Sequence, residues 1–179
     1  MRKTIFGCAC SLDLYIAREN HSVDWILWCD EARQMMADYW KTIDTVVMGR
    51  KTYEATLTMD GGDVDAPTTT TYIMSRTWTP DADRDKGAVL VDRDVVEFLR
   101  ELREQPGKDI CVMGGGELAR PLIEAGLIDE IGLNIHPVLL GSGVPLFHRL
   151  GQQVDLELTE CVEFSNGCVC LTYRPRAKN

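Results

Sequence analysis

A chain of 179 residues and 20.1 kDa is within the size range of one domain, so we expect a single domain over residues 1–179. Apolar residues make up 45% of the sequence and charged residues 26%, which excludes an extensively disordered chain. The 28 acidic and 19 basic residues give a formal charge of −9, which repels polyanions and argues against nucleic acid as a partner.

The seven cysteines and three histidines indicate neither a disulfide framework nor a metal site. The cysteine count is odd and no signal peptide precedes the first strand-like run, so we expect free thiols in a reducing cytoplasm. No cysteine pair has zinc-finger spacing and the histidines are scattered, so no metal is expected. No apolar segment approaches the roughly 20 residues that span a bilayer, so we do not expect an integral membrane protein.

Short apolar runs alternate with amphipathic segments, which predicts strands that alternate with helices. The expected elements, in order, are a strand over 3–10, a helix over about 25–40, strands over 45–48, 71–74 and 88–91, a helix over 94–104, a strand over 109–113, a helix over 117–125, a strand over 128–138, and a hairpin of strands 154–164 and 168–174. The hairpin is predicted by Asn166-Gly167 at its turn. Residues 61–69 are rich in turn formers and are expected to be a loop. This order favours an α/β fold with a largely parallel sheet and an antiparallel hairpin at one edge.

The most informative motif is Gly114-Gly115-Gly116, which joins an apolar strand to the next helix. Glycines let the backbone approach a ligand closely, and the N–H groups and dipole at the start of a helix favour an anion such as phosphate. The motif is not G-x-G-x-x-G, and no Lys-Ser or Lys-Thr follows it, so the two commonest nucleotide folds are disfavoured. A tight strand–helix corner without a ligand is the alternative for these glycines taken alone.

A second strand-to-helix junction carries groups that suit phosphate. Gly49 ends an apolar strand and is followed by Arg50, Lys51 and Thr52. A guanidinium holds phosphate through two parallel hydrogen bonds, so Arg50 is the preferred ligand and Lys51 is expected to be a solvated charge.

A third candidate lies at Ser75 and Arg76, directly after the strand over 71–74. Open α/β sheets bind their ligands at the carboxyl ends of strands, where a hydroxyl and a guanidinium suit one terminal phosphate. A solvated charge is the alternative for this pair alone. Several such places in one short chain suggest a ligand with more than one phosphate, and a dinucleotide is the natural candidate.

Together these motifs resemble the dihydrofolate reductase superfamily, and within it the branch that includes the C-terminal reductase domain of the riboflavin-biosynthesis protein RibD. The resemblance covers nearly the whole chain. The segments that carry it are Ser11-Leu12-Asp13 with Ile16-Ala17, Val47-Met48-Gly49-Arg50-Lys51-Thr52-Tyr53-Glu54, Met74-Ser75-Arg76, Val112-Met113-Gly114-Gly115-Gly116, and Leu140-Gly141-Ser142-Gly143 with Pro145-Leu146-Phe147. The resemblance implies a dihydrofolate reductase-like three-layer α/β fold, with a mostly parallel central sheet, and NADPH as the hydride donor.

Carried over position by position, the resemblance also implies a set of cofactor contacts. The backbone of Ala9 would bond the nicotinamide carboxamide, and Ser75 and Arg76 would select the 2′-phosphate. The contacts implied for the other phosphate groups and the pyrophosphate come from Gly49, Arg50, Thr52, Gly114, Gly115, Gly116 and Glu117.

Hydride transfer to a C=N or C=O group needs a proton for the neighbouring atom. The resemblance implies a carboxylic acid near the start of the first helix, a few residues after a tryptophan. Trp25 is followed by Asp30 and Glu31, and Asp30 has the matching spacing. A solvated acid in the first helical turn is an equal alternative for Asp30, because the stretch from it to Gly49 is longer than in typical folate reductases.

The sequence departs from the branch beside the expected nicotinamide. The branch usually has Gly after Ser-Leu-Asp, and this chain has Leu14, which implies a stiffer or more apolar loop. Asp13 is expected to form a turn rather than to act in catalysis. Residues 141–145 either shape the mouth of the substrate site or only connect strands.

The function implied is an NADPH-dependent oxidoreductase acting on a small heterocycle, either pterin-like or a ribosylaminopyrimidine. The second would be a 5-amino-6-(5-phosphoribosylamino)uracil reductase-like activity of riboflavin biosynthesis. The sequence has no deaminase-type His-x-Glu with Pro-Cys-x-x-Cys, so dihydrofolate reduction stays open as an alternative. A non-catalytic NADPH-binding sensor is the alternative from another class. The RibD branch further implies a homodimer.

Overall fold

The computed structural model describes residues 1–57, 69–81, 84–85 and 87–176. Most of the loop predicted over 61–69 therefore lies outside the described residues. The strands are β1 (Thr4–Ser11), β2 (Tyr15–Ala17), β3 (Ile43–Gly49), β4 (Thr70–Met74), β5 (Ala88–Val91), β6 (Asp109–Met113), β7 (Glu130–His136), β8 (Val144–Pro145), β9 (Leu156–Glu163) and β10 (Val169–Pro175). The helices are α1 (Asp30–Thr42), α2 (Arg50–Thr56), α3 (Val95–Glu104) and α4 (Gly116–Glu124).

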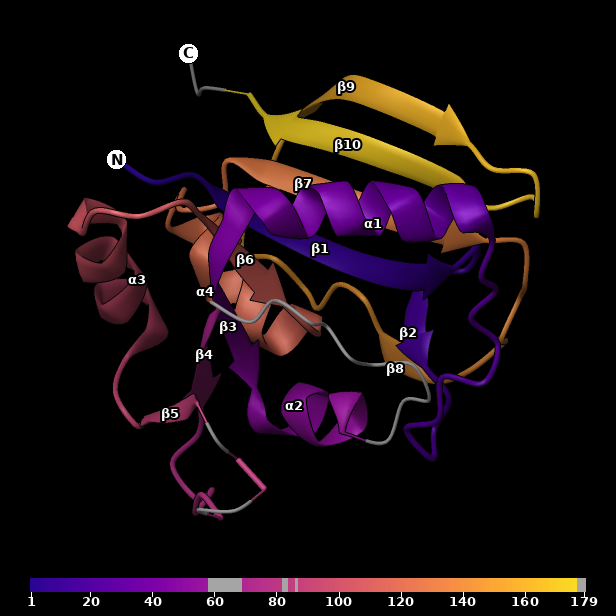
Figure 1. Ribbon diagram of the computed structural model, residues 1–179. Helices are drawn as coiled ribbons and strands as arrows, with labels where there is room; N and C mark the ends of the chain where they lie inside the picture. Colours follow the sequence, from indigo (N-terminus) through magenta and orange to yellow (C-terminus); the bar gives the residue numbers. More distant parts are fainter. Residues whose placement is uncertain (58–68, 82–83, 86, 177–179) are drawn as a thin grey trace.

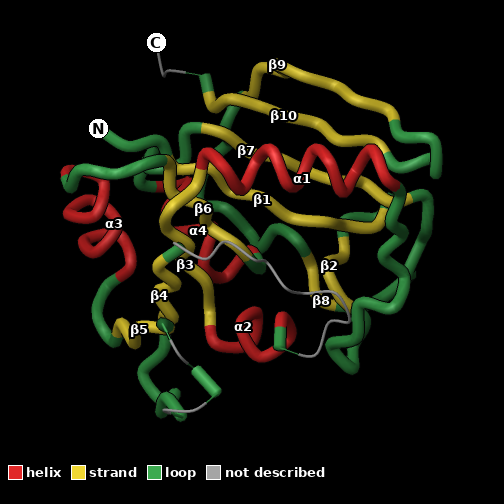
Figure 2. The backbone as a smooth tube through the Cα atoms, viewed as in Figure 1, coloured by secondary structure: helices red, strands yellow, loops and turns green. Residues whose placement is uncertain are grey.

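Eight of the strands form one sheet, in the order β5-β4-β3-β6-β1-β7-β10-β9 (Figures 1 and 2). Every neighbouring pair from β5 to β7 is parallel, whereas β10 runs antiparallel to both β7 and β9. Gly167 has φ +84° at the β9–β10 turn, a left-handed conformation that glycine adopts without steric cost. The predictions of a mostly parallel sheet and of a C-terminal antiparallel hairpin are both confirmed.

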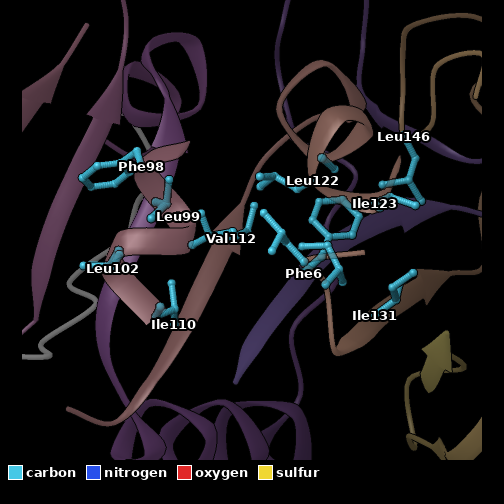
Figure 3. Close-up of a cluster of buried hydrophobic side chains, with 14 of the residues drawn as sticks. Phe6, Phe98, Leu99, Leu102, Ile110, Val112, Leu122, Ile123, Ile131 and Leu146 are labelled. Atoms are coloured by element: carbon cyan, nitrogen blue, oxygen red, sulfur yellow. The ribbon is translucent and has the colours of Figure 1, made fainter. Parts of the chain in front are cut away.

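Helices cover both faces of the sheet, which gives the three layers expected of the fold. In Figure 1, α1 crosses the front of the sheet. The opposite face packs against α3 and α4, and Figure 3 shows Leu122 of α4 beside Phe6 of β1, with Leu99 of α3 near Val112 of β6. Successive residues of a strand point to opposite faces, so Val112 of β6 lies in this core whereas Cys111 packs in the cluster on the α1 face.

The first helix begins later than the sequence predicted. It starts at Asp30, so the prediction of helix over 25–29 is wrong. The reason is a tertiary contact: the backbone N–H of Leu27 donates to Nδ1 of His136, at 3.1 Å, rather than to a carbonyl four residues earlier. The buried ring of Trp25 packs edge-on against the same imidazole, with centroids 5.3 Å apart. Residues 25–29 therefore cover the end of β7 instead of extending α1.

The small second sheet was not predicted. β2 pairs with β8, which lies within residues 141–145, the segment expected either to shape the mouth of the substrate site or only to connect strands. Two-residue and three-residue strands carry no readable periodicity, so only their pairing across the fold reveals them. Gly143 permits this pairing, because a Cβ at that position would lie 2.2 Å from the carbonyl oxygen of Ala17.

Candidate active site

The three segments predicted to bind phosphate leave neighbouring strands at one edge of the sheet. β4, β3 and β6 are adjacent and parallel, so their carboxyl ends lie side by side. Ser75 follows β4, Gly49 ends β3, and Gly114 follows β6. The structure thus brings together groups that are up to about 65 residues apart in the sequence, as a single extended ligand would require.

Gly114 and Thr52 are in direct contact, which joins the second of these segments to the third. Gly114 has φ +125°, and a Cβ there would lie 2.4 Å from the hydroxyl oxygen of Thr52. Only glycine permits both this backbone conformation and this close approach. The Thr52 hydroxyl therefore lies against the backbone of the glycine turn.

The three glycines do not all serve the same purpose. Gly116 is buried, and a Cβ there would lie 2.5 Å from the carbonyl oxygen of Leu146, so packing against the segment after β8 requires this glycine. Gly115 is the N-cap of α4, and a Cβ there would meet only Cδ1 of Ile16, at 3.2 Å. The corner alternative therefore accounts for Gly116. The N–H groups of Gly116 and Glu117, the first two residues of α4, have no acceptor within the helix, whereas Leu118 donates to the carbonyl of Gly115, at 3.1 Å.

Arg50 lies at the first position of α2, and its guanidinium bonds to both carboxylate oxygens of Glu54, at 2.9 and 3.2 Å. Both side chains are partly exposed, and exposed i,i+4 pairs contribute only about 0.3–0.5 kcal/mol. A phosphate can therefore replace the carboxylate of Glu54 at small cost. Lys51 is exposed, in agreement with its assignment as a solvated charge.

Ser75 shapes the turn that follows β4. Its Oγ accepts the N–H groups of Thr77, at 3.2 Å, and Trp78, at 3.0 Å. The hydroxyl proton of Ser75 stays available, because these bonds use only the oxygen lone pairs. Arg76, next to it, is exposed and has no ion-pair partner within the described parts of the chain. A free guanidinium and a hydroxyl donor are thus held together at the end of β4.

The backbone of Ala9 faces the place where β1 and β6 part. The ladder between these strands ends at the pair Gly7 and Met113, while β1 continues along β7 to Ser11. The carbonyl of Lys3 points toward β6, because it accepts the N–H of Ile110. Along a strand, the backbone N–H and C=O groups of every second residue point to the same neighbouring strand. The N–H and C=O of Ala9 therefore also point to the β6 side of β1.

This parting is a topological switch point. The chain leaves β1 for α1 on one face of the sheet and leaves β6 for α4 on the other face. Ligands of open α/β sheets bind at such points, outside the carboxyl ends of the strands.

The two candidate proton donors lie at the start of α1. Asp30 is exposed, and no hydrogen bond to its carboxylate is found among the described residues. Glu31 accepts a hydrogen bond from the hydroxyl of Ser165, at 2.8 Å, and this bond, together with one from Cys29, lowers the pKa of the carboxyl. A lowered pKa makes Glu31 a poorer acid catalyst at neutral pH.

Asp13 holds two loops together, as its assignment to a turn implied. Its carboxylate accepts the hydroxyl of Ser11, at 2.6 Å, and the backbone N–H groups of Leu140 and Gly141, at 3.1 and 2.8 Å. The hydrogen bond from Ser11 contributes most to lowering the pKa of Asp13. Leu14 has φ +62°, a left-handed conformation that favours glycine over a residue with a side chain.

Sequence reasoning missed a buried carboxylate near the edge that is predicted to bind phosphate. Asp85 has a fully buried side chain and accepts the hydroxyl of Tyr53, at 2.9 Å, the N–H of Asp81, at 2.7 Å, and two guanidinium bonds from Arg84. The bond to Tyr53 ties α2 to the segment that follows β4. No local pattern could have revealed it, because Tyr53 and Asp85 are 32 residues apart and lie in different elements.

Over the described ranges, no group of three or more His, Cys, Asp or Glu side chains is placed to hold a metal ion. Within the same residues, no helix is long and apolar enough to cross a membrane.

Comparison with known proteins finds a match over residues 2–170 to the family described as the RibD C-terminal domain. The uncharacterized protein YwjB of Bacillus subtilis (strain 168) is 35% identical over 166 residues, which cover 91% of this chain and 92% of that protein. A putative riboflavin biosynthesis protein from Shewanella sp. PV-4 has a similar structure, with a TM-score of 0.82, 26% identity, and coverage of 98% and 99% of the two chains. Dihydrofolate reductase from Enterococcus faecalis, complexed with NADP(H), has a similar fold, with a TM-score of 0.68, 20% identity, and coverage of 98% and 97%.

Proposed function

Because the chain belongs to the family of RibD C-terminal domains, within the dihydrofolate reductase superfamily, we propose that it is an NADPH-dependent reductase of the riboflavin-biosynthesis type. Its substrate would be a ribosylaminopyrimidine or a pterin-like heterocycle, as for a 5-amino-6-(5-phosphoribosylamino)uracil reductase. The observation that carries this proposal is the alignment of three anion-binding segments at the ends of the adjacent strands β4, β3 and β6.

The residues at this edge fit an extended dinucleotide. Arg76 carries a guanidinium with no ion-pair partner among the described residues, beside the hydroxyl of Ser75, which suits the 2′-phosphate of NADPH. Arg50 and Thr52 lie one strand further along, next to the turn of Gly114, and suit the pyrophosphate. Glu117, in the first turn of α4, is proposed to close over the same group through the backbone.

Ala9 completes the proposed cofactor site. Its backbone N–H and C=O face the parting of β1 and β6, two strands beyond the phosphate contact at β3. A carboxamide has one acceptor and one donor, which match these two backbone groups. When bound there, NADPH supplies the hydride, and the residues of this chain fix the ring against β1.

The folate alternative depends on a buried acid beside the ring. Asp30, whose spacing matches that of the acid in folate reductases, is exposed, so it is not the buried acid that this alternative requires. This favours the pyrimidine substrate over folate. Asp30 stays a proposed proton donor only for a substrate that excludes water from its carboxylate on binding.

Calorimetric titration with NADPH and NADH tests the cofactor assignment. We expect Arg76→Ala to weaken NADPH binding by about 10- to 100-fold, because it removes charge-assisted hydrogen bonds of about 1.5–3 kcal/mol. NADH, which has no 2′-phosphate, should bind Arg76→Ala and the wild type alike. Arg100→Ala, at an exposed position on α3, is the matched control and should leave both affinities unchanged. Equal losses for the two cofactors would show that Arg76 does not select the 2′-phosphate.

Turnover separates the enzyme from a non-catalytic sensor. NADPH oxidation would be followed with 5-amino-6-(5-phosphoribosylamino)uracil, with dihydrofolate, and with a panel of simple carbonyl compounds. Oxidation with the pyrimidine is the expected result. Tight NADPH binding without oxidation by any of these compounds would favour the sensor.

A further inference from the structure

Unpartnered polar atoms gather at the carboxyl end of β7, on the face of the sheet that α1 covers. The side-chain oxygen of Asn134, Nε2 of His136 and the indole N–H of Trp25 are all buried, and none has a hydrogen-bond partner among the described residues. His136 has no exposed surface at all. Leaving buried polar atoms unpaired is costly, so several in one place indicate contacts that a ligand completes.

The hydrogen bonds of His136 determine which nitrogen carries its proton. Nδ1 accepts the backbone N–H of Leu27, at 3.1 Å, and the Sγ of Cys168 lies 3.2 Å from the same nitrogen. A nitrogen that accepts a backbone N–H is unprotonated, so the neutral ring has its proton on Nε2. Burial lowers the pKa of His136, which keeps the ring neutral. His136 is therefore a fixed N–H donor, and this N–H points away from Cys168 and hence away from β10.

The other side of β7 is β1, and the register places His136 beside Ser11 and Asn134 beside Ala9. Side chains at alternate positions share a face, so Asn134 and His136 lie on the same face as the side chain of Ala9. Ala9 is the residue whose backbone is proposed to contact the nicotinamide.

At two facing positions next to these residues, the sheet carries no side chain. Gly7 and Gly132 are paired across β1 and β7. A Cβ on Gly7 would meet no atom within 4 Å, and one on Gly132 would meet only the carbonyl oxygen of Phe6, at 4.0 Å. Two facing glycines with free space above them accommodate a flat ring, which side chains at these positions would obstruct.

We propose that His136 and Asn134 recognise the lactam edge of the hydride acceptor, a heterocycle with adjacent C=O and N–H groups. The Nε2–H of His136 donates to the lactam oxygen, and the side-chain oxygen of Asn134 accepts from the lactam N–H. This inference rests on the proposed function, since it assigns the substrate side of the same site. The pyrimidinedione ring of a ribosylaminopyrimidine carries such an edge, as does a pterin.

Two substitutions of His136 separate recognition from a purely structural role. His136→Gln places an amide N–H near the position of Nε2 but removes the acceptor for Leu27, whereas His136→Asn keeps an acceptor near Nδ1 but has no group at Nε2. We expect His136→Gln to be the less stable variant to urea and yet the better ligand binder. If His136 has only a structural role, the less stable variant will also be the weaker ligand binder. That result would overturn the proposal.

The binding probe is 5,6-diaminouracil, titrated calorimetrically into the NADPH-saturated wild type and both variants. We expect the dissociation constant to rise about tenfold or more in His136→Asn and clearly less in His136→Gln. The matched control ligand is 5,6-diamino-1,3-dimethyluracil, which lacks ring N–H groups and should bind the wild type at least about tenfold more weakly. Equal binding of the two uracils, or no binding of diaminouracil to the wild type, would overturn the proposal.

The failure of this inference can be told apart from failure of the proposed function. NADPH should bind His136→Gln, His136→Asn and the wild type with the same affinity, because no cofactor contact is assigned to His136. If NADPH does not bind the wild type, the proposed function fails. The two uracils titrated into the protein alone would still test recognition by His136.

Discussion

Replacement of Gly114 by alanine tests the close contact at the glycine turn. A Cβ there would lie 2.4 Å from Oγ1, 3.2 Å from Cβ and 3.3 Å from Cγ2 of Thr52. Overpacking of this kind costs about 1–3 kcal/mol. The φ of +125° adds about 1–3 kcal/mol for a residue with a side chain. We therefore expect Gly114→Ala to lower the free energy of unfolding by about 2–6 kcal/mol.

A double-mutant cycle separates these two contributions. Thr52→Ala removes Oγ1 and Cγ2, so in the Gly114→Ala background it should restore the overpacking part, about 1–3 kcal/mol, and leave the backbone part unrestored. Urea unfolding of the four proteins, with linear extrapolation to water, gives the coupling energy. Full stability of Gly114→Ala, or additive effects of the two substitutions, would show that Thr52 and Gly114 are not in contact.

Substitutions at three further positions should give results that residue preferences alone would not predict. Gly116→Ala should lower the unfolding free energy by about 1–3 kcal/mol in urea, despite the helix preference for alanine, because its Cβ would lie 2.5 Å from the carbonyl of Leu146; a stabilised variant would contradict that packing. Leu14→Gly should be more stable than Leu14→Ala by about 0.5–1 kcal/mol in thermal unfolding, since glycine avoids the left-handed strain at φ +62°, and equal melting temperatures would argue against the strain. Hydrogen bonds, first from Arg84 and then from the N–H of Asp81 and the hydroxyl of Tyr53, hold the pKa of Asp85 well below its usual range. The carboxylate therefore stabilises the fold above its unfolded pKa of about 3.9, and this contribution is lost as pH falls below that value. Asp85→Asn should thus be less stable at pH 7, with a gap to the wild type that narrows in acid, whereas a gap independent of pH would show that the charge contributes nothing.

Local signals in the sequence predicted most of the sheet. The apolar runs located β1, β3, β4, β5 and β6 to within about two residues. Asn166-Gly167 predicted the β9–β10 hairpin, because that dipeptide favours the required turn conformation by itself. Residues 25–29 were the main error, because their helical pattern was overridden by the bond from Leu27 to His136, which the chain can form only after folding.

The candidate site, like the fold, could be predicted from the sequence only in part. The sequence pointed to Gly49, Ser75 and Gly114 as separate ends of strands, since Gly49 and Gly114 each precede a helix and Ser75 directly follows an apolar run. It could not assign different purposes to the glycines, because the packing of Gly116 depends on Leu146, thirty residues further along the chain. Nor did it mark His136, a single scattered histidine in the sequence.

By itself, the sequence determined that three strand ends carry groups that suit phosphate, because the local signals for these junctions act between residues a few positions apart. The tertiary structure alone decided that these junctions leave the adjacent strands β4, β3 and β6, and that β1 parts from β6 beside Ala9. It also decided that His136 is buried and that its Nε2 has no hydrogen-bond partner in the part of the chain that the structure describes. These features depend on contacts between distant segments, and their geometry exists only once the sheet has formed.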